Sequence, residues 1–132
     1  PFPDRSFDVV LNVESSHAYG SVPRFLDEVK RVLRPGGVLA LADIRRAAGM
    51  PVLHEELQRS GMEVERHRDI SEHVVRAMTL EDDLKRRRIR GHVRWPVEPL
   101  FLEFAGVVGS SMHTSLVDGS RVYHQFLLAR QR

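Results

Sequence analysis

The sequence has 132 residues, enough for one domain with a single core, and its 42% hydrophobic and 29% charged residues are typical of a globular protein. Its 20 basic and 18 acidic residues leave a formal net charge of +2, so overall charge indicates no nucleic-acid partner. There is no cysteine, which excludes disulfides and thiolate metal sites, and no run of residues resembles a membrane span or a signal peptide. We therefore expect a cytoplasmic protein.

The most informative pattern lies in residues 7–43, where two apolar runs flank an amphipathic segment. The runs 7–13 and 38–43 are apolar nearly throughout, as is typical of strands buried on both faces of a parallel sheet. Between them, Ser21 is suited to cap a helix that ends at Pro35-Gly36-Gly37. Ligands of open α/β sheets bind outside the carboxyl ends of such strands. The polar residues 14–17 and Asp43 fall at these ends.

The remainder of the sequence predicts a helix, a strand, a helical insert and a closing strand. The helix is expected over 51–60, before Gly61, and the strands are expected over 62–70 and 121–129. The residues between these strands predict three helices, over 72–78, 80–89 and 100–108. The expected fold class is therefore α/β, with a parallel sheet, a helical insertion and a late strand.

Two motifs resemble class I S-adenosylmethionine-dependent small-molecule methyltransferases. They are the run Pro3-Asp4-Arg5-Ser6-Phe7-Asp8-Val9-Val10 and the run Arg31-Val32-Leu33-Arg34-Pro35-Gly36-Gly37. The stretch Glu14-Ser15-Ser16-His17-Ala18-Tyr19 resembles, more specifically, the O-methyltransferases that act on polyketide-derived lipids, sugars or sterols, including phthiotriol-type enzymes. The resemblance extends through residues 69–75 and the insert, and so covers essentially the whole chain.

This resemblance implies a partial Rossmann-like sheet made of the family's fourth to seventh strands, the last of them antiparallel. Residues 1–70 and 120–132 would form the partial methyltransferase domain, and residues 71–119 would form a helical lid that binds the acceptor. The family's glycine-rich cofactor turn has no counterpart, since the nine glycines contain no Gly-x-Gly. Because the sequence also begins without methionine, we expect a carboxy-terminal piece from which most of the S-adenosylmethionine site is absent.

The resemblance also assigns chemical roles to residues at the strand ends. His17 would be the general base that takes a proton from an acceptor hydroxyl, and Asp43 would orient His17 and stabilise its protonated form. Asn12, Val13 and Glu14 would contact the cofactor. The alternatives are structural: His17 fills a loop, Asp43 caps the next segment and Asn12 satisfies a strand end.

The expected acceptor is an apolar small molecule, bound by residues of the loop after the first strand and of the insert. The acceptor-binding candidates are Tyr19, Phe101, Phe104 and Met112. The alternative for Tyr19 is an ordinary half-buried aromatic residue. The apolar stripe over 100–108 fits a ligand pocket and an ordinary core equally well.

Two other groups of residues are candidates for a binding site. The basic run 85–90 has the charge to bind phosphates or an anionic membrane surface, but Glu81, Asp82 and Asp83 precede it at i,i+4 spacing, which indicates a solvated helix. The histidines are scattered without the spacing of a metal-binding motif, so we expect no metal site. The histidines in question are His54, His67, His73, His92, His113 and His124.

Two functions of different classes follow. The first is methyl transfer from S-adenosylmethionine to a hydroxyl of a lipid, polyketide, sugar or sterol. The second is a truncated, catalytically incomplete methyltransferase that only associates with itself. The second rests on the apolar first strand, which would form an exposed sheet edge and so predicts a dimer. Binding of an anionic surface by residues 85–90 is a more distant third.

Overall fold

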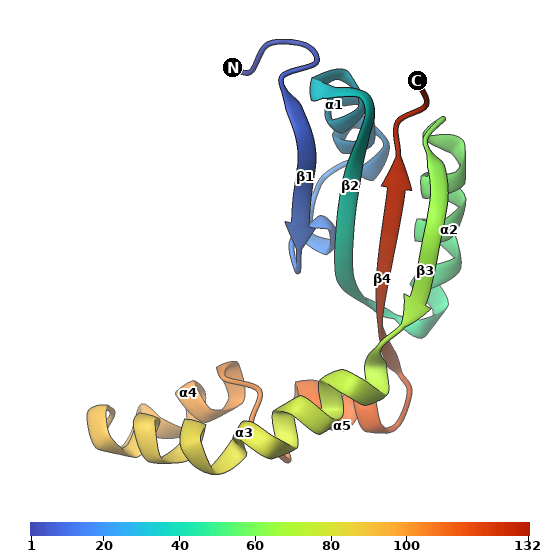
Figure 1. The fold of residues 1–132 in the computed structure, drawn as a ribbon. Helices are drawn as coiled ribbons and strands as arrows, with labels where there is room; N and C mark the ends of the chain where they lie inside the picture. The colour runs from blue at the N-terminus through green and yellow to red at the C-terminus, as the bar shows by residue number, and fades with distance from the viewer. The chain divides into compact units, whose positions relative to one another are not determined.

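The computed structural model describes all 132 residues and divides into two compact units, residues 1–69 with 122–132 and residues 70–121 (Figure 1). The first unit is an α/β layer and the second is helical. The first unit contains β1 (Phe7–Val13), the 3-10 helix η1 (Ser16–Ala18), α1 (Val22–Val32), β2 (Leu33–Arg46), the 3-10 helix η2 (Ala47–Gly49), α2 (Met50–Arg59), β3 (Glu63–Asp69) and β4 (Arg121–Ala129). Arg121, the first residue of β4, falls in the second unit. The second unit contains α3 (Ser71–His92), α4 (Glu98–Phe104) and α5 (Ser111–Val117).

The four strands form one sheet in the order β1-β2-β4-β3. β1 and β2 are parallel, whereas β3 and β4 are antiparallel. Figure 1 shows β4 pointing opposite to β1 and β3. The predicted α/β class, with a late antiparallel strand inserted beside the parallel ones, is confirmed, and the strand order is that of a partial Rossmann-like sheet.

The core of the first unit lies on one face of the sheet, beneath α1 and α2. Both helices direct their apolar stripes against the inward-facing side chains of β2 and β4. The buried cluster comprises Leu26, Val29, Leu33, Leu39, Leu41, Met50, Leu53, Leu57, Met62, Phe126 and Leu128. This packing holds the carboxyl ends of β1 and β2 in place, where the predicted site lies.

The ends of α1 follow from local chemistry. As predicted, Ser21 caps the helix, since its side chain accepts a hydrogen bond from the Arg24 backbone N–H at 3.3 Å. The Arg130 guanidinium donates to the carbonyl oxygens of Lys30, at 2.6 Å, and of Leu33. Carbonyl groups at a helix end lack intrahelical partners, so this arginine ties β4 to the end of α1.

β2 is longer than predicted and includes the Pro35-Gly36-Gly37 segment. Gly36 has a φ of +80°, and a Cβ on Gly37 would lie 2.9 Å from the Arg34 carbonyl oxygen and 3.0 Å from that of Asp8. The prediction that α1 ends at this segment is wrong, because the helix ends at Val32 and the extended backbone of β2 begins at Leu33. β2 also continues past Asp43, the end of the predicted strand, to Arg46.

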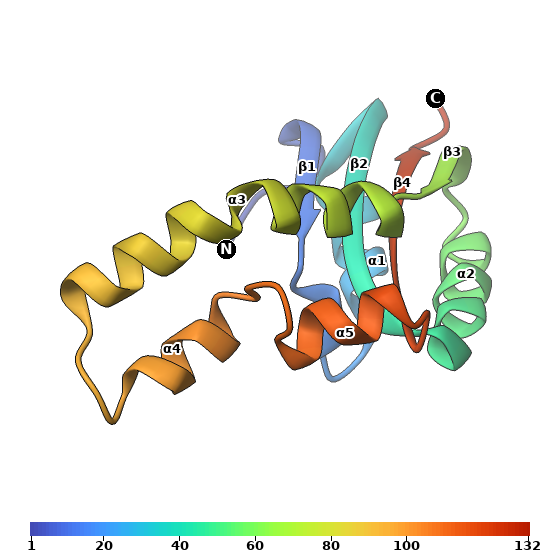
Figure 2. The ribbon, with the colours of Figure 1, turned by 90° about the horizontal axis from the view of Figure 1, so that it is seen from below.

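The second unit differs from its prediction in three places. Residues 71–92 form one continuous helix rather than two, and the i,i+4 pairs Glu81–Lys85 at 3.5 Å and Asp82–Arg86 at 2.7 Å support its middle. α4 ends at Phe104, before Gly106 with its φ of +63°, so the helix predicted over 100–108 is too long (Figure 2). α5 was not predicted.

β1 forms one edge of the sheet. Val9, Leu11 and Val13 are 58%, 72% and 51% exposed, while Val10 packs against the core between them. β1 is therefore an edge strand, as predicted, and these three side chains are exposed on the face of the sheet opposite to that of Val10. Burial of this strand on both faces, which its apolar run predicts, is wrong, and the dimer remains a prediction. None of the helices has both the length and the apolar character needed to cross a bilayer.

Candidate active site

The candidate site lies where β1 and β2 end side by side. The Glu14 N–H donates to the Ala42 carbonyl at 2.9 Å, which continues the pairing one residue past β1. Glu14 then adopts a φ of +49°, an uncommon conformation for a residue other than glycine. This bend starts the turn into η1, which carries His17 back toward the end of β2.

Asp43 is the centre of the site, and its side chain is fully buried. One carboxylate oxygen accepts from His17 Nδ1 at 2.8 Å and from the Ile44 N–H at 2.9 Å. The other accepts from Arg45 Nη1 at 2.7 Å and from the Ser16 hydroxyl. Burial by itself would raise the pKa of Asp43, but the hydrogen bonds from Ser16 and His17 and the charge of Arg45 outweigh it and lower that pKa.

The contacts of His17 define its tautomer. An ionised Asp43 can only accept, so the bonded Nδ1 must carry a proton, and the lone pair of a neutral ring is then on Nε2. The His17 side chain is 43% exposed, so this ring is reachable from solvent. His17 therefore combines a fixed orientation with an available proton acceptor.

Ser16 and Arg45 belong to the site, although the sequence analysis gave Ser16 a place at the strand end without a role and did not predict Arg45. Arg45 Nη2 donates to Ser16 Oγ at 2.9 Å, and both residues hold Asp43, which leaves the Arg45 side chain only 14% exposed. Arg45 could have been found from the sequence, because it follows Asp43 by two positions and so lies on the same side of the strand. Ser16 has no comparable signal beyond its place beside His17.

Asn12 and Tyr19 form a second polar group beside Asp43. Asn12 is 7% exposed, and its Nδ2 donates to the Tyr19 hydroxyl at 2.7 Å. The same hydroxyl lies 3.0 Å from Ser15 Oγ. Asn12 Oδ1 is buried and has no hydrogen-bond partner. A buried acceptor without a partner costs about 1–3 kcal/mol, which marks Asn12 as a candidate ligand-binding group.

Tyr123, on β4, extends the site toward the sheet and was not predicted. Burial raises its pKa, and the neighbouring Glu14 carboxylate acts in the same direction through its charge and a hydrogen bond. The pairing of β4 into the middle of the sheet, rather than any sequence motif, accounts for this contact.

The other predicted site residues do not join this group. Val13 ends β1 with a half-exposed side chain. Phe101, Phe104 and Met112 all lie in the second unit, where Phe101 is 46% exposed and Phe104 is 92% exposed. The structure therefore brings together Asn12, Glu14, His17, Tyr19 and Asp43, while the acceptor-binding role of the insert stays a prediction.

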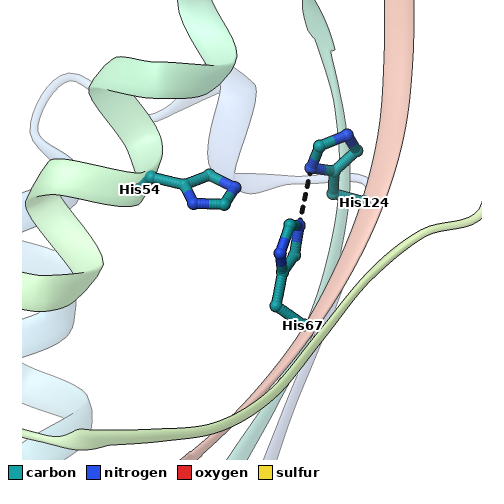
Figure 3. Close-up of side chains that lie close together, drawn as sticks. All are labelled: His54, His67 and His124. Atoms are coloured by element: carbon teal, nitrogen blue, oxygen red, sulfur yellow. Dashed lines mark hydrogen bonds between the residues drawn. The ribbon is translucent and has the colours of Figure 1, made fainter.

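The interpretation of the histidines as scattered is wrong for three of them. Figure 3 shows His54 of α2, His67 of β3 and His124 of β4 pointing toward one another. A nitrogen atom from each ring lies within 4.8 Å of those from the other two. Sequence spacing could not show this, because the contact depends on the pairing of β3 with β4 and on the packing of α2.

Comparison with known proteins agrees with this fold. Residues 1–41 match the family described as "Methyltransferase domain". The phthiotriol/phenolphthiotriol dimycocerosates methyltransferase of Mycobacterium leprae is 36% identical over 135 aligned residues, which cover 98% of this chain and 48% of that protein. A probable phthiotriol/phenolphthiotriol dimycocerosates methyltransferase 2 of Mycobacterium ulcerans is 45% identical over 106 residues, which cover 80% and 39%. The chain thus spans about half the length of the curated relatives it matches.

Solved structures share the fold at low sequence identity. Phosphoethanolamine N-methyltransferase 2 of Haemonchus contortus, in complex with S-adenosyl-L-methionine, superposes with a TM-score of 0.77 at 13% identity, covering 100% of this chain and 35% of that one. The cyclopropane synthase MmaA2 of Mycobacterium tuberculosis gives a TM-score of 0.76 at 13% identity, covering 96% and 56%. In sequence the chain therefore resembles methyltransferases over nearly its whole length, and in fold it resembles methyltransferases solved with S-adenosyl-L-methionine.

Proposed function

We propose that this chain contributes the general base, part of the cofactor site and part of the acceptor site to an S-adenosylmethionine-dependent O-methyltransferase of lipid-type small molecules. The observation that supports this most strongly is the pair formed by His17 and Asp43, with Nδ1 2.8 Å from a fully buried carboxylate. A base positioned in this way suits removal of a proton from a hydroxyl acceptor.

The proton transfer follows from the contacts of His17. Nε2, which does not face Asp43, takes the hydroxyl proton of the acceptor, and the electron pair of the broken O–H bond stays on the acceptor oxygen, which is the atom that receives the methyl group. The resulting imidazolium holds protons on both ring nitrogens, and the ionised Asp43 compensates its charge. Ser16 and Arg45 fix the carboxylate, so the ring does not have to reorient during the step.

Asn12, Val13 and Glu14 are the residues of this chain that would hold the cofactor. S-adenosylmethionine, when bound, supplies a methyl group activated by its attachment to a positively charged sulfur. The unpartnered, buried Asn12 Oδ1 fits such a ligand, because a donor there would satisfy an oxygen that no group of the chain satisfies. Glu14 adds negative charge beside it, which suits a cationic ligand.

The acceptor class rests on the relatives' names and on exposed apolar side chains. The names of the Mycobacterium leprae and Mycobacterium ulcerans relatives give phthiotriol and phenolphthiotriol dimycocerosates as substrates, and a relative in Mycolicibacterium smegmatis is named a fatty-acid O-methyltransferase. In this chain, Phe101 and Phe104 expose apolar surface that suits contact with a lipid chain. We assign residues 71–119 as the acceptor-binding lid on this basis.

The test uses a chimaera in which this chain replaces the matching segment of the Mycobacterium leprae methyltransferase. Transfer of a labelled methyl group to a phthiotriol acceptor is measured for the chimaera and for its His17→Gln variant. We expect His17→Gln to lower kcat by about 10²- to 10⁴-fold, because a general base contributes that much. His54→Gln, in α2 and outside the hydrogen bonds of the His17–Asp43 pair, is the matched control and should change kcat little.

Binding of S-adenosylhomocysteine, measured by calorimetry, separates catalysis from cofactor affinity. His17→Gln should leave this affinity unchanged in the chimaera, whereas Asn12→Ala should weaken it. A His17→Gln variant with the parent's kcat would contradict the assignment of the base. The same titration with the isolated 132-residue chain shows whether these residues bind the cofactor without the rest of an enzyme.

Self-association through β1 is a second candidate, favoured by the exposed Val9, Leu11 and Val13 at the sheet edge. An unpaired apolar edge strand is a template for pairing with another chain. We expect the isolated chain to sediment as a concentration-dependent dimer in analytical ultracentrifugation and Leu11→Lys to shift it toward monomer. Leu100→Lys, an equally exposed leucine on α4, is the control. A monomer at all concentrations would contradict this candidate.

A further inference from the structure

The histidine cluster of the first unit shares no hydrogen bond with His17 or Asp43 and has no role in the proposed methyl transfer. It joins α2 to the β3–β4 edge of the sheet (Figure 3). His67 Nε2 and His124 Nδ1 are 2.9 Å apart, and the His54 ring stands edge-on to His67 with 4.3 Å between ring centroids. Three imidazoles from three elements therefore meet at one point.

The protonation state of these rings suits metal binding. Burial lowers the pKa of His54 and His67, and the charge of a neighbouring histidine lowers each further. Burial also lowers the pKa of His124, although Asp69 opposes this. These shifts act toward the neutral ring, and a neutral imidazole has the lone pair that a metal ion requires.

We propose that His54, His67 and His124 bind one divalent transition-metal ion of the zinc class, with the fourth coordination position open to solvent. Tetrahedral Zn²⁺ with Zn–N bonds of 2.0–2.1 Å requires ring nitrogens about 3.3 Å apart. The present separations are at most 4.8 Å, so small side-chain rotations complete the geometry. The ion would replace the His67–His124 hydrogen bond with two metal bonds.

Two features around the cluster support this proposal. Asp69 Oδ2 lies 3.5 Å from His124 Nε2, so the carboxylate can hold the proton on that nitrogen and leave Nδ1 for the ion. A hollow of about 460 Å³, open to solvent, is lined by Met50, Pro51, His54, Glu55, Val122 and His124. It provides an entry path for the ion and space for a water molecule in the fourth position.

The simpler interpretation is an aromatic stack, since His67 lies parallel to Phe126 with 4.6 Å between centroids. A stack explains the position of His67 but not why nitrogen atoms of three rings converge. The two interpretations differ in a measurable way, because only a metal site takes up one ion per chain and releases protons or solvent when it does.

The test begins with the tag-free 132-residue chain, freed of metal by a chelator and titrated with Co²⁺ and then Zn²⁺. We expect the visible absorption of tetrahedral Co²⁺ to saturate at one ion per chain and to disappear when Zn²⁺ displaces the Co²⁺. Imidazole resonances of ¹⁵N-histidine-labelled protein should shift for His54, His67 and His124. This measurement needs no substitution, so it decides the question even if a variant fails to fold.

Variants then assign the ligands. His54→Gln, His67→Gln and His124→Gln should each weaken Zn²⁺ binding by at least about tenfold, and Asp69→Asn by about 10- to 100-fold as a positioning residue. His113→Gln and His17→Gln are controls and should bind as the parent does. The proposal fails if no ion is taken up, or if the resonances that move belong to His17 or His113.

Discussion

The two units of this protein bury their apolar side chains to very different extents. In the first unit, α1, α2 and the sheet share one continuous cluster of buried residues. In the second, only Met78, Val107 and Leu116 are fully buried apolar residues. Its large exposed apolar side chains are Leu80, Leu84, Trp95, Val97, Leu100, Phe101, Phe104 and Val117.

Polar contacts take the place of a large core in the second unit. Asp82 accepts from the Val108 N–H at 2.7 Å and from Arg86 Nε at 2.7 Å, and Arg86 donates to the Val108 carbonyl at 2.6 Å. Glu103 accepts from the Ser111 N–H at 2.9 Å. The two units are therefore stabilised in different ways, the first by a buried apolar core and the second largely by polar contacts. The first unit has a continuous core beneath the proposed catalytic groups, while the second leaves exposed the apolar surface that the proposed acceptor would contact.

The largest expected effect breaks the buried network of the first unit. Asp43→Asn leaves the Arg45 guanidinium, only 14% exposed, without its counter-charge. Removing one partner of a buried ion pair costs about 3–5 kcal/mol, and we expect urea denaturation to show a loss of this size. Asp83→Asn, on the exposed face of α3, is the control from the second unit and should change stability little. A loss well below this range would mean that water reaches Arg45.

Acid denaturation checks the same contact independently. The pKa of Asp43 is lower in the folded chain than its ordinary value near 3.8, so the unfolded state binds its proton first as pH falls. The stability that Asp43 contributes is therefore complete above about pH 4 and is lost as pH falls through the lower folded-state pKa. Asp43→Asn should remove this part of the loss of stability at acid pH.

The elements that sequence reasoning predicted well have strong local signals. Ser21 and Pro23 mark the start of α1, and the apolar run over 121–129 is the strand β4. The elements that were predicted wrongly have weak local signals. α5 has seven residues and little helical periodicity, and nothing between Met78 and Leu80 revealed that α3 continues. Short or highly charged helices depend on tertiary contacts that a single sequence does not contain.

The functional residues also include a contact that the sequence predicts and a cluster that it does not. The contact between His17 and Asp43 was predictable, because the carboxyl ends of adjacent parallel strands meet at one edge of the sheet. The cluster of His54, His67 and His124 was not, because its members are far apart in sequence. Their meeting follows from the register that pairs Asp69 with His124 and from the packing of α2, neither of which has a sequence signal.

A matched pair of leucines sharpens the comparison between the units. Leu53, on α2, is 1% exposed, whereas Leu100, on α4, is 68% exposed. Leu53→Ala should destabilise the chain by about 2–5 kcal/mol, because it leaves a cavity in the core. Leu100→Ala should stay within about 0.5 kcal/mol of the parent. Thermal and urea unfolding of both variants measures the difference, and equal losses would mean that α4 is covered by other residues.

A pair of glycines should give smaller effects than Leu53→Ala, and effects of opposite sign. A Cβ on Gly37 would meet the Arg34 and Asp8 carbonyl oxygens at 2.9 and 3.0 Å, so Gly37→Ala should cost about 1–3 kcal/mol through overpacking. Gly91, in α3, has no neighbour within 4 Å of a Cβ, and Gly91→Ala should stabilise the helix by up to about 1 kcal/mol. Unfolding midpoints that move in the same direction for both variants would contradict the contrast between a tightly packed first unit and an open second one.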